Sequence, residues 1–209
     1  MPPAPLNIPI QALQGQYIRL EPYCEGNKDA LRAALDCDAT AWDLFAASGQ
    51  GVHFDTWWAN ILKATEAGTW VAYAICRLSD QRIVGTSSFL NIKPERQCAE
   101  IGGTFLHPDV RATTVNPEAK WLMLHHAFAS GARRVELLTD ARNVRSQAAI
   151  AKLGAVREGV LRRDRITWTG HIRDSVIYAI TDLDWPAVSQ RLQDRLRQTP
   201  PPTAASAAT

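Results

Sequence analysis

The spacing of apolar and polar residues along the chain predicts alternating strands and helices. The strand pattern, with alternating or continuously apolar residues, is found at 17–23, 69–78, 82–92, 98–108, 133–140, 156–168 and 172–180. Helical spacing of three and four residues is found at 25–38, 54–67, 117–130, 143–154 and 185–198. Because the strands between 69 and 108 follow one another closely, they predict an antiparallel meander.

This order of elements predicts a mixed α/β sheet with helices packed against it. A chain of 209 residues is long enough for one domain with a sizeable core, which we place at 15–198 after an N-terminal extension at 1–14. The last helix, 185–198, is short and amphipathic and is expected to pack on the body of the domain. Residues 199–209 contain few large apolar side chains and are predicted to be disordered.

The composition excludes several classes of function. The net charge is +2, from 23 basic and 21 acidic side chains, which does not fit a dedicated nucleic-acid-binding protein. The first residues, MPPAPLNIPIQAL, show neither a basic n-region nor a sustained apolar h-region, and no run of about 18 apolar residues is found, so we expect a cytoplasmic protein with no membrane partner. Four scattered cysteines without a CxxC pair argue against a zinc site and against a disulfide framework, and no metal is expected.

The segment VRATTVNPEAKWLML, residues 110–124, connects a predicted strand to a predicted helix. Free main-chain N–H groups and the helix dipole make such a turn suitable for binding an anion, phosphate above all. Pro117 suits the first helical position, and Arg111 and Lys120 would add positive charge. A simpler alternative is that Asn116 only caps the helix. Neither G-x-G-x-x-G nor the P-loop motif is present.

The same segment resembles the acetyl-coenzyme A loop of the GCN5-related N-acetyltransferase (GNAT) superfamily, typically [RQ]-x-x-G-x-[GA]. The corresponding positions are Arg111, Ala112, Thr113, Thr114, Val115 and Asn116. Threonine and asparagine thus replace the two small residues. We expect Asn116 to tolerate a left-handed conformation and Thr114 to avoid one, so that the loop differs locally from the family pattern.

The resemblance extends over about residues 15–185. EIGGTFLHPDVR before the loop and RVELLTDARNVRSQAAIAKLGAVREGVLR after it are similar to the GNAT branch that acetylates ribosomal-protein N-termini and small amines. It implies the GNAT fold, a mostly antiparallel twisted sheet flanked by helices. It also implies acetyl-CoA as cofactor and direct transfer of the acetyl group to a primary amine in a ternary complex.

The acceptor stays open between a small-molecule amine and a protein N-terminus, and a homodimer is compatible with the resemblance. An acid-lined open groove would indicate a protein N-terminus, and an enclosed aromatic pocket a small amine; the tryptophans favour the latter. The alternative function is a catalytically silent CoA-binding or sensing module, because the loop lacks the usual glycines.

The resemblance also implies which residues bind the cofactor. Main-chain N–H groups near Phe105, Leu106 and His107 would hold the thioester carbonyl, and the loop from Arg111 to Asn116, with Lys120, would hold the phosphates. Asn143 would contact the pantetheine arm, Ser146 would protonate the departing thiolate, and Lys152 would reach the nucleotide phosphates. The local sequence fits equally well a helix capped by Asn143 and a solvated Lys152.

Acyl transfer further requires a base for the amine. Glu100 is the first candidate, acting through water, with a structural carboxylate paired with a neighbouring arginine as its alternative. Asp164 is the second candidate, with a charged, solvated strand face as its alternative. The residues expected to line the acceptor pocket are Trp42, Phe45, His53, Trp57 and Trp168. The alternative is an aromatic core for the first four and an exposed hairpin tip for Trp168. Cys98 raises an acetyl-cysteine route, which we disfavour because no partner histidine and acid can be assigned.

Overall fold

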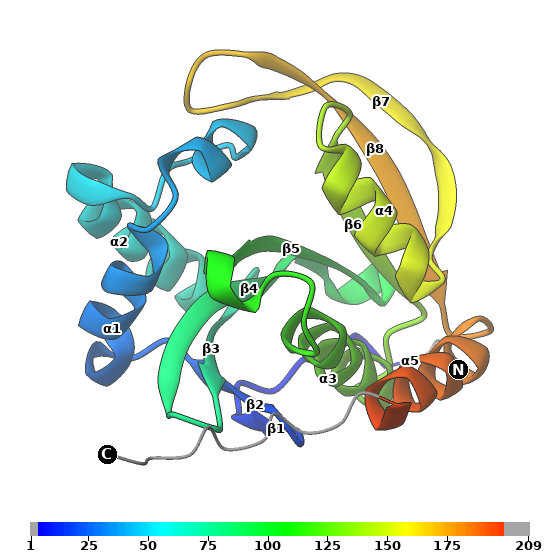
Figure 1. The fold of residues 1–209 in the computed structure, drawn as a ribbon. Helices are drawn as coiled ribbons and strands as arrows, with labels where there is room; N and C mark the ends of the chain where they lie inside the picture. The colour runs from blue at the N-terminus through cyan, green and yellow to red at the C-terminus, as the bar shows by residue number, and fades with distance from the viewer. Residues whose placement is uncertain (1–3, 199–209) are drawn as a thin grey trace.

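A computed structural model describes residues 4–198 and shows an eight-stranded sheet with helices on both faces (Figure 1). The strand order is β1-β2-β3-β4-β5-β6-β8-β7. Among these described strands, β5 and β6 pair in parallel and all other neighbours pair antiparallel. The predicted mixed, mostly antiparallel sheet is therefore confirmed. The predicted disordered segment 199–209 lies outside the described residues.

The bounds of the elements follow the hydrophobic pattern closely. The strands are β1 (Leu13–Gln14), β2 (Ile18–Pro22), β3 (Val71–Arg77), β4 (Arg82–Lys93), β5 (Cys98–Leu106), β6 (Arg134–Asp140), β7 (Val156–Ile166) and β8 (Ile172–Thr181). The α-helices are α1 (Glu25–Leu35), α2 (Phe54–Glu66), α3 (Val115–Ala129), α4 (Val144–Leu153) and α5 (Trp185–Gln198). Short 3-10 helices include η1 (Ala39–Leu44) and η2 (Gly51–His53) in the aromatic connection between α1 and α2.

Two differences from the predicted elements have simple physical reasons. Strand β1 has two residues, too few for an alternating pattern to be visible. Helix α3 begins at Val115, so Pro117 occupies the third helical position rather than the first. Its missing N–H still costs nothing there, because the first turn of a helix has no internal acceptors for its N–H groups.

Two hydrophobic clusters lie on opposite faces of the sheet, as successive side chains of β3 show. Tyr73 and Ile75 join the larger cluster, formed with α3, α4 and α5, whereas Ala74 joins the smaller one, formed with α1, α2 and η1. The buried stripe of α5, at Val188 and Leu192, confirms the expected packing of this helix. Among residues 4–198, no helix combines the length and apolar character needed to cross a membrane.

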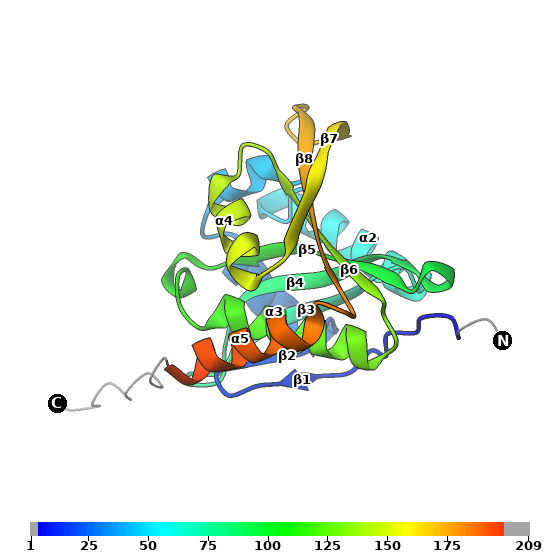
Figure 2. The ribbon, with the colours of Figure 1, turned by 90° about the vertical axis from the view of Figure 1, so that its right-hand side faces the viewer.

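The hairpin of β7 and β8 projects beyond the rest of the sheet and arches toward η1 and α2 (Figures 1 and 2). Its tip is fastened to η1 by Trp168, which donates from the indole Nε1 to Trp42 O at 2.9 Å and from its main-chain N to Phe45 O at 3.1 Å. The N-terminal segment also packs on the body, with Leu6 and Ile8 buried.

Candidate active site

A cleft opens where β5 and β6 separate. The two strands are in parallel register only from Cys98 to Glu100 on β5 and from Arg134 to Glu136 on β6. Beyond these pairs β5 continues to Leu106 and β6 to Asp140, so their main chains diverge without pairing. The cleft between them has a volume of about 570 Å³, within the usual range for small-molecule and cofactor sites.

The structure brings most of the predicted site residues into this cleft. The predicted residues that line it are Trp42, Phe45, Trp57, Glu100, Phe105, Leu106, Arg111, Asn116, Lys120, Asn143 and Ser146. The predicted residues outside its lining are His53, His107, Thr113, Thr114, Val115, Lys152, Asp164 and Trp168.

A β-bulge on β5 disturbs the main chain on the floor of the cleft. Ser88 pairs with Gly102 and Thr86 with Phe105, so β5 holds one more residue than β4 between these pairs. Gly103 takes a left-handed φ of 58°, which glycine adopts without steric cost. Bulges leave a residue outside the ladder, and the two residues of this bulge, Gly103 and Thr104, both line the cleft. By contrast, the N–H of His107 is used in the sheet, donating to Val84 O at 2.8 Å.

The turn before α3 differs from the expected one in its backbone conformation. The left-handed residue is Ala112, with φ 62°, whereas Thr114 has φ −70° and Asn116 is not among the positive-φ residues. Thr114, not Asn116, is the N-cap residue. Thr114 therefore avoids positive φ as predicted, but the expected left-handed or capping role of Asn116 is wrong. Its buried Oδ1 has no hydrogen-bond partner in the described part of the chain.

The two basic residues of this turn are both engaged within the protein. Arg111 pairs with Asp38 at 2.6 Å and donates from Nε to Leu106 O at 3.0 Å. Lys120 is buried, and its Nζ donates to the hydroxyls of Ser87 and Thr104. In this turn the groups left to bind an anion are therefore main-chain N–H groups at the start of α3. One of them, the N–H of Val115, already donates to Thr113 Oγ1 at 3.3 Å.

Helix α4 forms the opposite wall. Asn143 is its N-cap residue, and its Oδ1 accepts the main-chain N–H of Ser146 at 2.9 Å. Both residues line the cleft, and the cap uses neither the amide nitrogen of Asn143 nor the hydroxyl of Ser146. Gly154 ends the helix at φ 95°, as the sequence predicted. Lys152 lies exposed on this helix.

Glu100 occupies the point at which the strands diverge. The residue is 4% exposed, and its Oε2 accepts from Asn91 Nδ2 at 2.8 Å. Burial raises the pKa of the carboxyl, while Arg165, at 3.9 Å, and the hydrogen bond from Asn91 partly oppose the shift. A buried carboxyl with a raised pKa is a stronger proton acceptor than an ordinary surface carboxylate, which suits Glu100 to act as a base in this cleft.

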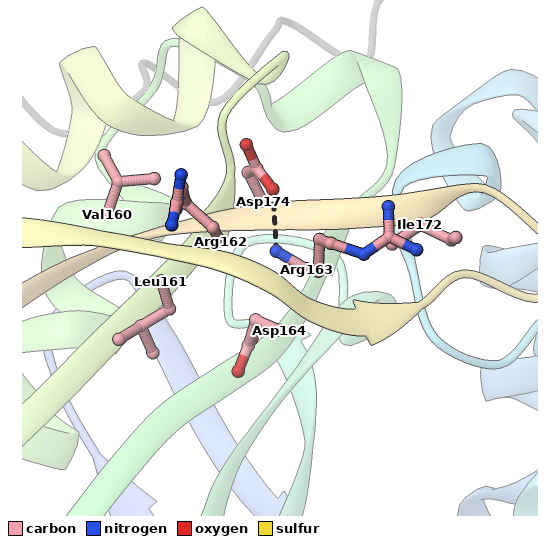
Figure 3. A pocket seen from close by; sticks show the side chains of 7 residues that line it. All are labelled: Val160, Leu161, Arg162, Arg163, Asp164, Ile172 and Asp174. Atoms are coloured by element: carbon pink, nitrogen blue, oxygen red, sulfur yellow. Dashed lines mark hydrogen bonds between the residues drawn. The ribbon is translucent and has the colours of Figure 1, made fainter.

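Asp164 has the opposite electrostatic character. Burial alone would raise its pKa, but hydrogen bonds from Ser175 and Arg165 lower it overall. Figure 3 shows Asp164 in a second hollow, of about 710 Å³, which is lined by seven residues of the β7–β8 hairpin alone. In this hollow Asp174 accepts a hydrogen bond from the main-chain N–H of Arg163, which stabilises β7 where its register with β8 is irregular (Figure 3). The hollow is wide open and contains none of the polar groups of the cleft.

Three arginines that line the cleft, Arg145, Arg165 and Arg173, were not predicted from the sequence. Arg165 on β7 and Arg173 on β8 both line it, and Arg173 is 7% exposed. Their sequence context, charged residues on strands, is typical of solvated strand faces. Gly102-Gly103 inside a strand was a signal for the bulge, because glycine in a strand often marks one.

The acetyl-cysteine alternative finds no support in the surroundings of Cys98. Its thiol is buried, and burial raises its pKa, which disfavours the thiolate that would attack a thioester. Cys98 also does not line the cleft.

Comparisons with known proteins agree with this geometry. The family model of the acetyltransferase (GNAT) domain matches residues 18–156. A T. thermophilus structure assigned to the acetyltransferases is 33% identical, with a TM-score of 0.79 over 89% of this chain and 97% of that one. A GCN5-related N-acetyltransferase from Brucella melitensis is 24% identical, with a TM-score of 0.84 over 92% and 89% of the two chains.

A more distant structure, Mycobacterium smegmatis RimJ in complex with CoA-disulfide, is 20% identical, with a TM-score of 0.74 over 93% of this chain and 95% of that one. A search of the curated proteins gives no match. The separated strands and the cleft define an acyl-CoA N-acyltransferase fold. The chain belongs to the GNAT acetyltransferase family and is an N-acetyltransferase that uses acetyl-CoA.

Proposed function

We propose that the chain acetylates the primary amine of a small molecule by direct transfer, with Glu100 accepting the proton of the amine through water and Ser146 donating one to the leaving sulfur. Acetyl-CoA supplies the activated acetyl group. The observation that carries the proposal is the position of Glu100, a buried carboxyl at the divergence of β5 and β6 that faces the same cleft as Ser146.

The residues around the cleft fit the cofactor. At the start of α3, the N–H of Val115 is satisfied by Thr113 and Pro117 has none, which leaves the N–H of Asn116 for an anion. Across the cleft, the amide nitrogen of Asn143 is a donor for the amides of the pantetheine arm.

The reaction balances without a further reagent. The amine nitrogen bonds to the acetyl carbonyl carbon, the carbon–sulfur bond breaks, and coenzyme A leaves as its thiol. One proton leaves the amine for Glu100 and one reaches the sulfur from Ser146. Exchange with water returns both side chains to their starting states.

The lining of the cleft supports a small amine over a protein N-terminus. Four aromatic side chains from the aromatic connection, α2 and β5 contribute to it, namely Trp42, Phe45, Trp57 and Phe105. Its basic side chains, Arg111, Lys120, Arg145, Arg165 and Arg173, outnumber its acidic ones, Glu100 and Asp140. The cleft is therefore not the acid-lined groove expected for a protein N-terminus, and its aromatic wall suits a compact acceptor.

Electrostatics favour Glu100 over Asp164 as the base. Glu100 has a raised pKa and lies in the cleft, whereas Asp164 has a lowered pKa and pairs with Arg165 at 2.8 Å. A carboxylate held in its ionised form by an arginine is a weak proton acceptor.

Release of free thiol from acetyl-CoA, measured with a panel of amines over a range of pH, tests the proposal. Wild-type activity should fall on the acidic side as Glu100 becomes protonated. Glu100→Gln should lower kcat by about 100-fold or more and abolish this acidic-side decline. Glu136→Gln is a matched control, because Glu136 is the register partner of Glu100 and lies outside the cleft. An unchanged rate and pH profile in Glu100→Gln would exclude it as the base.

A further inference from the structure

Arg165 and Arg173 face each other across neighbouring strands. They are register partners in the antiparallel pair of β7 and β8, and both line the cleft. Two like charges opposite each other on a sheet are destabilising, and Arg165 is one of the influences that lower the pKa of Arg173, after burial itself. A pair of this kind needs an anion close by.

The carboxylates near Arg165 and Arg173 do not neutralise both arginines. Arg165 pairs with Asp164 at 2.8 Å, and Asp140 pairs with Arg142 at 2.7 Å. Among the described residues Arg173 has no carboxylate within 4 Å; its Nε donates to Ser175 Oγ at 2.8 Å and its Nη1 lies 3.4 Å from Leu44 O.

Arg173 is thus a buried cation whose hydrogen-bond partners are neutral, and the charges of Asp140, Asp164 and Glu100 act on it only from beyond ion-pair distance. Its side chain belongs to a residue that is 7% exposed, so the charge has lost most of its contact with water. A buried charge without a counter-ion is costly, and the cost is recovered when an anionic ligand binds there. The guanidinium group is suited to a carboxylate, which it binds in a planar, bidentate geometry.

The residues around Arg165 and Arg173 indicate which other chemical groups a ligand bound by them would have. Arg165 Nη2 lies 3.9 Å from Glu100 Oε2, so an anionic group bound by the arginines would lie close to the proposed proton acceptor. On the other side, Arg173 reaches Leu44 O, in the segment that contributes Trp42 and Phe45 to the cleft. A ligand in this position meets a carboxylate-binding group, a base and an aromatic wall within one small space.

We propose that Arg173, together with Arg165, binds the carboxylate of an α-amino acid whose amine faces Glu100 and whose bulky apolar side chain lies against Trp42 and Phe45. An α-amino acid places its amine and its carboxylate on one carbon, which matches the closeness of Glu100 and the arginine pair. This inference rests on the proposed acetylation of a small amine and names its substrate class.

Three acceptors with the same phenyl ring and amine test the assignment: phenylalanine, phenylalaninamide, which has the same size but no carboxylate charge, and phenethylamine, which lacks the carboxyl group. The wild-type kcat/KM, measured by thiol release, should be about 10- to 100-fold higher for phenylalanine than for the other two, the range expected for losing hydrogen bonds to a charged group. Alanine, which keeps the carboxylate but lacks the ring, should also be acetylated less efficiently than phenylalanine.

Variants separate the carboxylate contact from general damage. Arg173→Gln should lower kcat/KM for phenylalanine by about 10- to 100-fold, leave phenylalaninamide nearly unchanged, and leave the KM for acetyl-CoA unchanged. Arg173→Lys, which keeps the charge but not the fork, should lose less. Arg162→Gln is the control, because Arg162 belongs to the same hairpin but lines the outer hollow.

Three outcomes would overturn the inference. They are equal use of phenylalanine and phenylalaninamide by the wild type, equal loss for all acceptors in Arg173→Gln, and turnover only with amines that lack a carboxylate. The comparison of acceptors with the wild-type enzyme does not depend on the variants folding. If no amine at all releases thiol, the proposed function itself fails, which is a separate result.

Discussion

The side-chain nitrogen of Lys120 lies 2.6 Å from Thr104 Oγ1 and 2.9 Å from Ser87 Oγ, in a site where the described residues provide no carboxylate within ion-pair distance. Removing a cation from water without an anionic partner favours the neutral form. Burial accordingly lowers the pKa of Lys120 to about 7. The structure therefore holds this amine near its neutral state beneath the cleft, not as a fixed positive charge at the phosphate end.

This burial predicts a pH-dependent stability. Between about pH 7 and pH 10 the unfolded chain carries a proton on this lysine that the folded chain lacks, so the free energy of unfolding should rise with pH by up to about 1.4 kcal/mol per unit. Lys120→Met should remove this contribution and be more stable than the wild type near pH 6.5. Urea unfolding at pH 6.5, 7.5 and 8.5 measures the effect, with the exposed Lys63→Met as control. Equal pH slopes for the wild type and Lys120→Met would contradict the assignment.

Glu118 connects α3 to the first hairpin, which predicts a large contribution to stability. Its buried carboxylate accepts main-chain N–H groups from Gln16 at 2.7 Å and from Tyr17 and Ile18 at 2.8 Å. Glu118→Gln replaces one acceptor oxygen by a donor and should cost about 2–3 kcal/mol of unfolding free energy, because a buried N–H loses its partner. The partly exposed Glu158→Gln, which loses an ion pair to Arg134, should cost about 1 kcal/mol or less. Similar losses in the two variants by urea unfolding would refute this role.

The hydrogen bond between Trp168 at the hairpin tip and Trp42 of η1 predicts that a change at Trp168 affects acceptor binding and not cofactor binding. Trp168 is 41% exposed and does not line the cleft, but its indole N–H binds Trp42 O, next to the aromatic wall. Trp168→Phe should raise the KM for the acceptor by about 2- to 10-fold, the effect of one lost hydrogen bond, and leave the KM for acetyl-CoA unchanged. Trp121→Phe loses an equivalent bond to Ser189 on the other side of the sheet and should change neither constant. If steady-state kinetics show the same change in both variants, the hydrogen bond from Trp168 to Trp42 has no specific role in acceptor binding.

The hydrophobic pattern was sufficient to predict nearly all of the regular elements. Helix α4 illustrates why: Ile150 and Leu153 give the buried stripe, Asn143 caps the start and Gly154 ends the helix, so each signal agrees with the others. The arrangement of the last strands was less predictable. Strand β8 inserts between β6 and β7, and no local spacing indicates which edge of the sheet a hairpin joins.

The candidate site was predicted where local chemistry determines it and missed where tertiary register does. Glu100 and Ser146 reach the cleft as expected. Arg165 and Arg173 were missed because an irregularity between Leu161 and Arg165, with Arg163 at φ 52°, changes the alternation of the strand. The turn before α3 was predicted as an anion site, yet the charge of Arg111 is taken up by Asp38, an ion pair across 73 positions of the chain that spacing does not reveal.

Ser146 allows the chemistry to be separated from binding, because its structural role belongs to its main chain. The N–H of Ser146, not its hydroxyl, completes the cap with Asn143, so Ser146→Ala should leave α4 intact. If the hydroxyl protonates the leaving sulfur, kcat should fall by about 10- to 100-fold while the Kd for coenzyme A, measured by calorimetry, changes by less than about 3-fold. Gln147→Ala is the control on the same helix, since its side chain binds Ala141 O outside the cleft. Equal losses of kcat and cofactor affinity in Ser146→Ala would mean that the hydroxyl binds the cofactor and does not act as the acid.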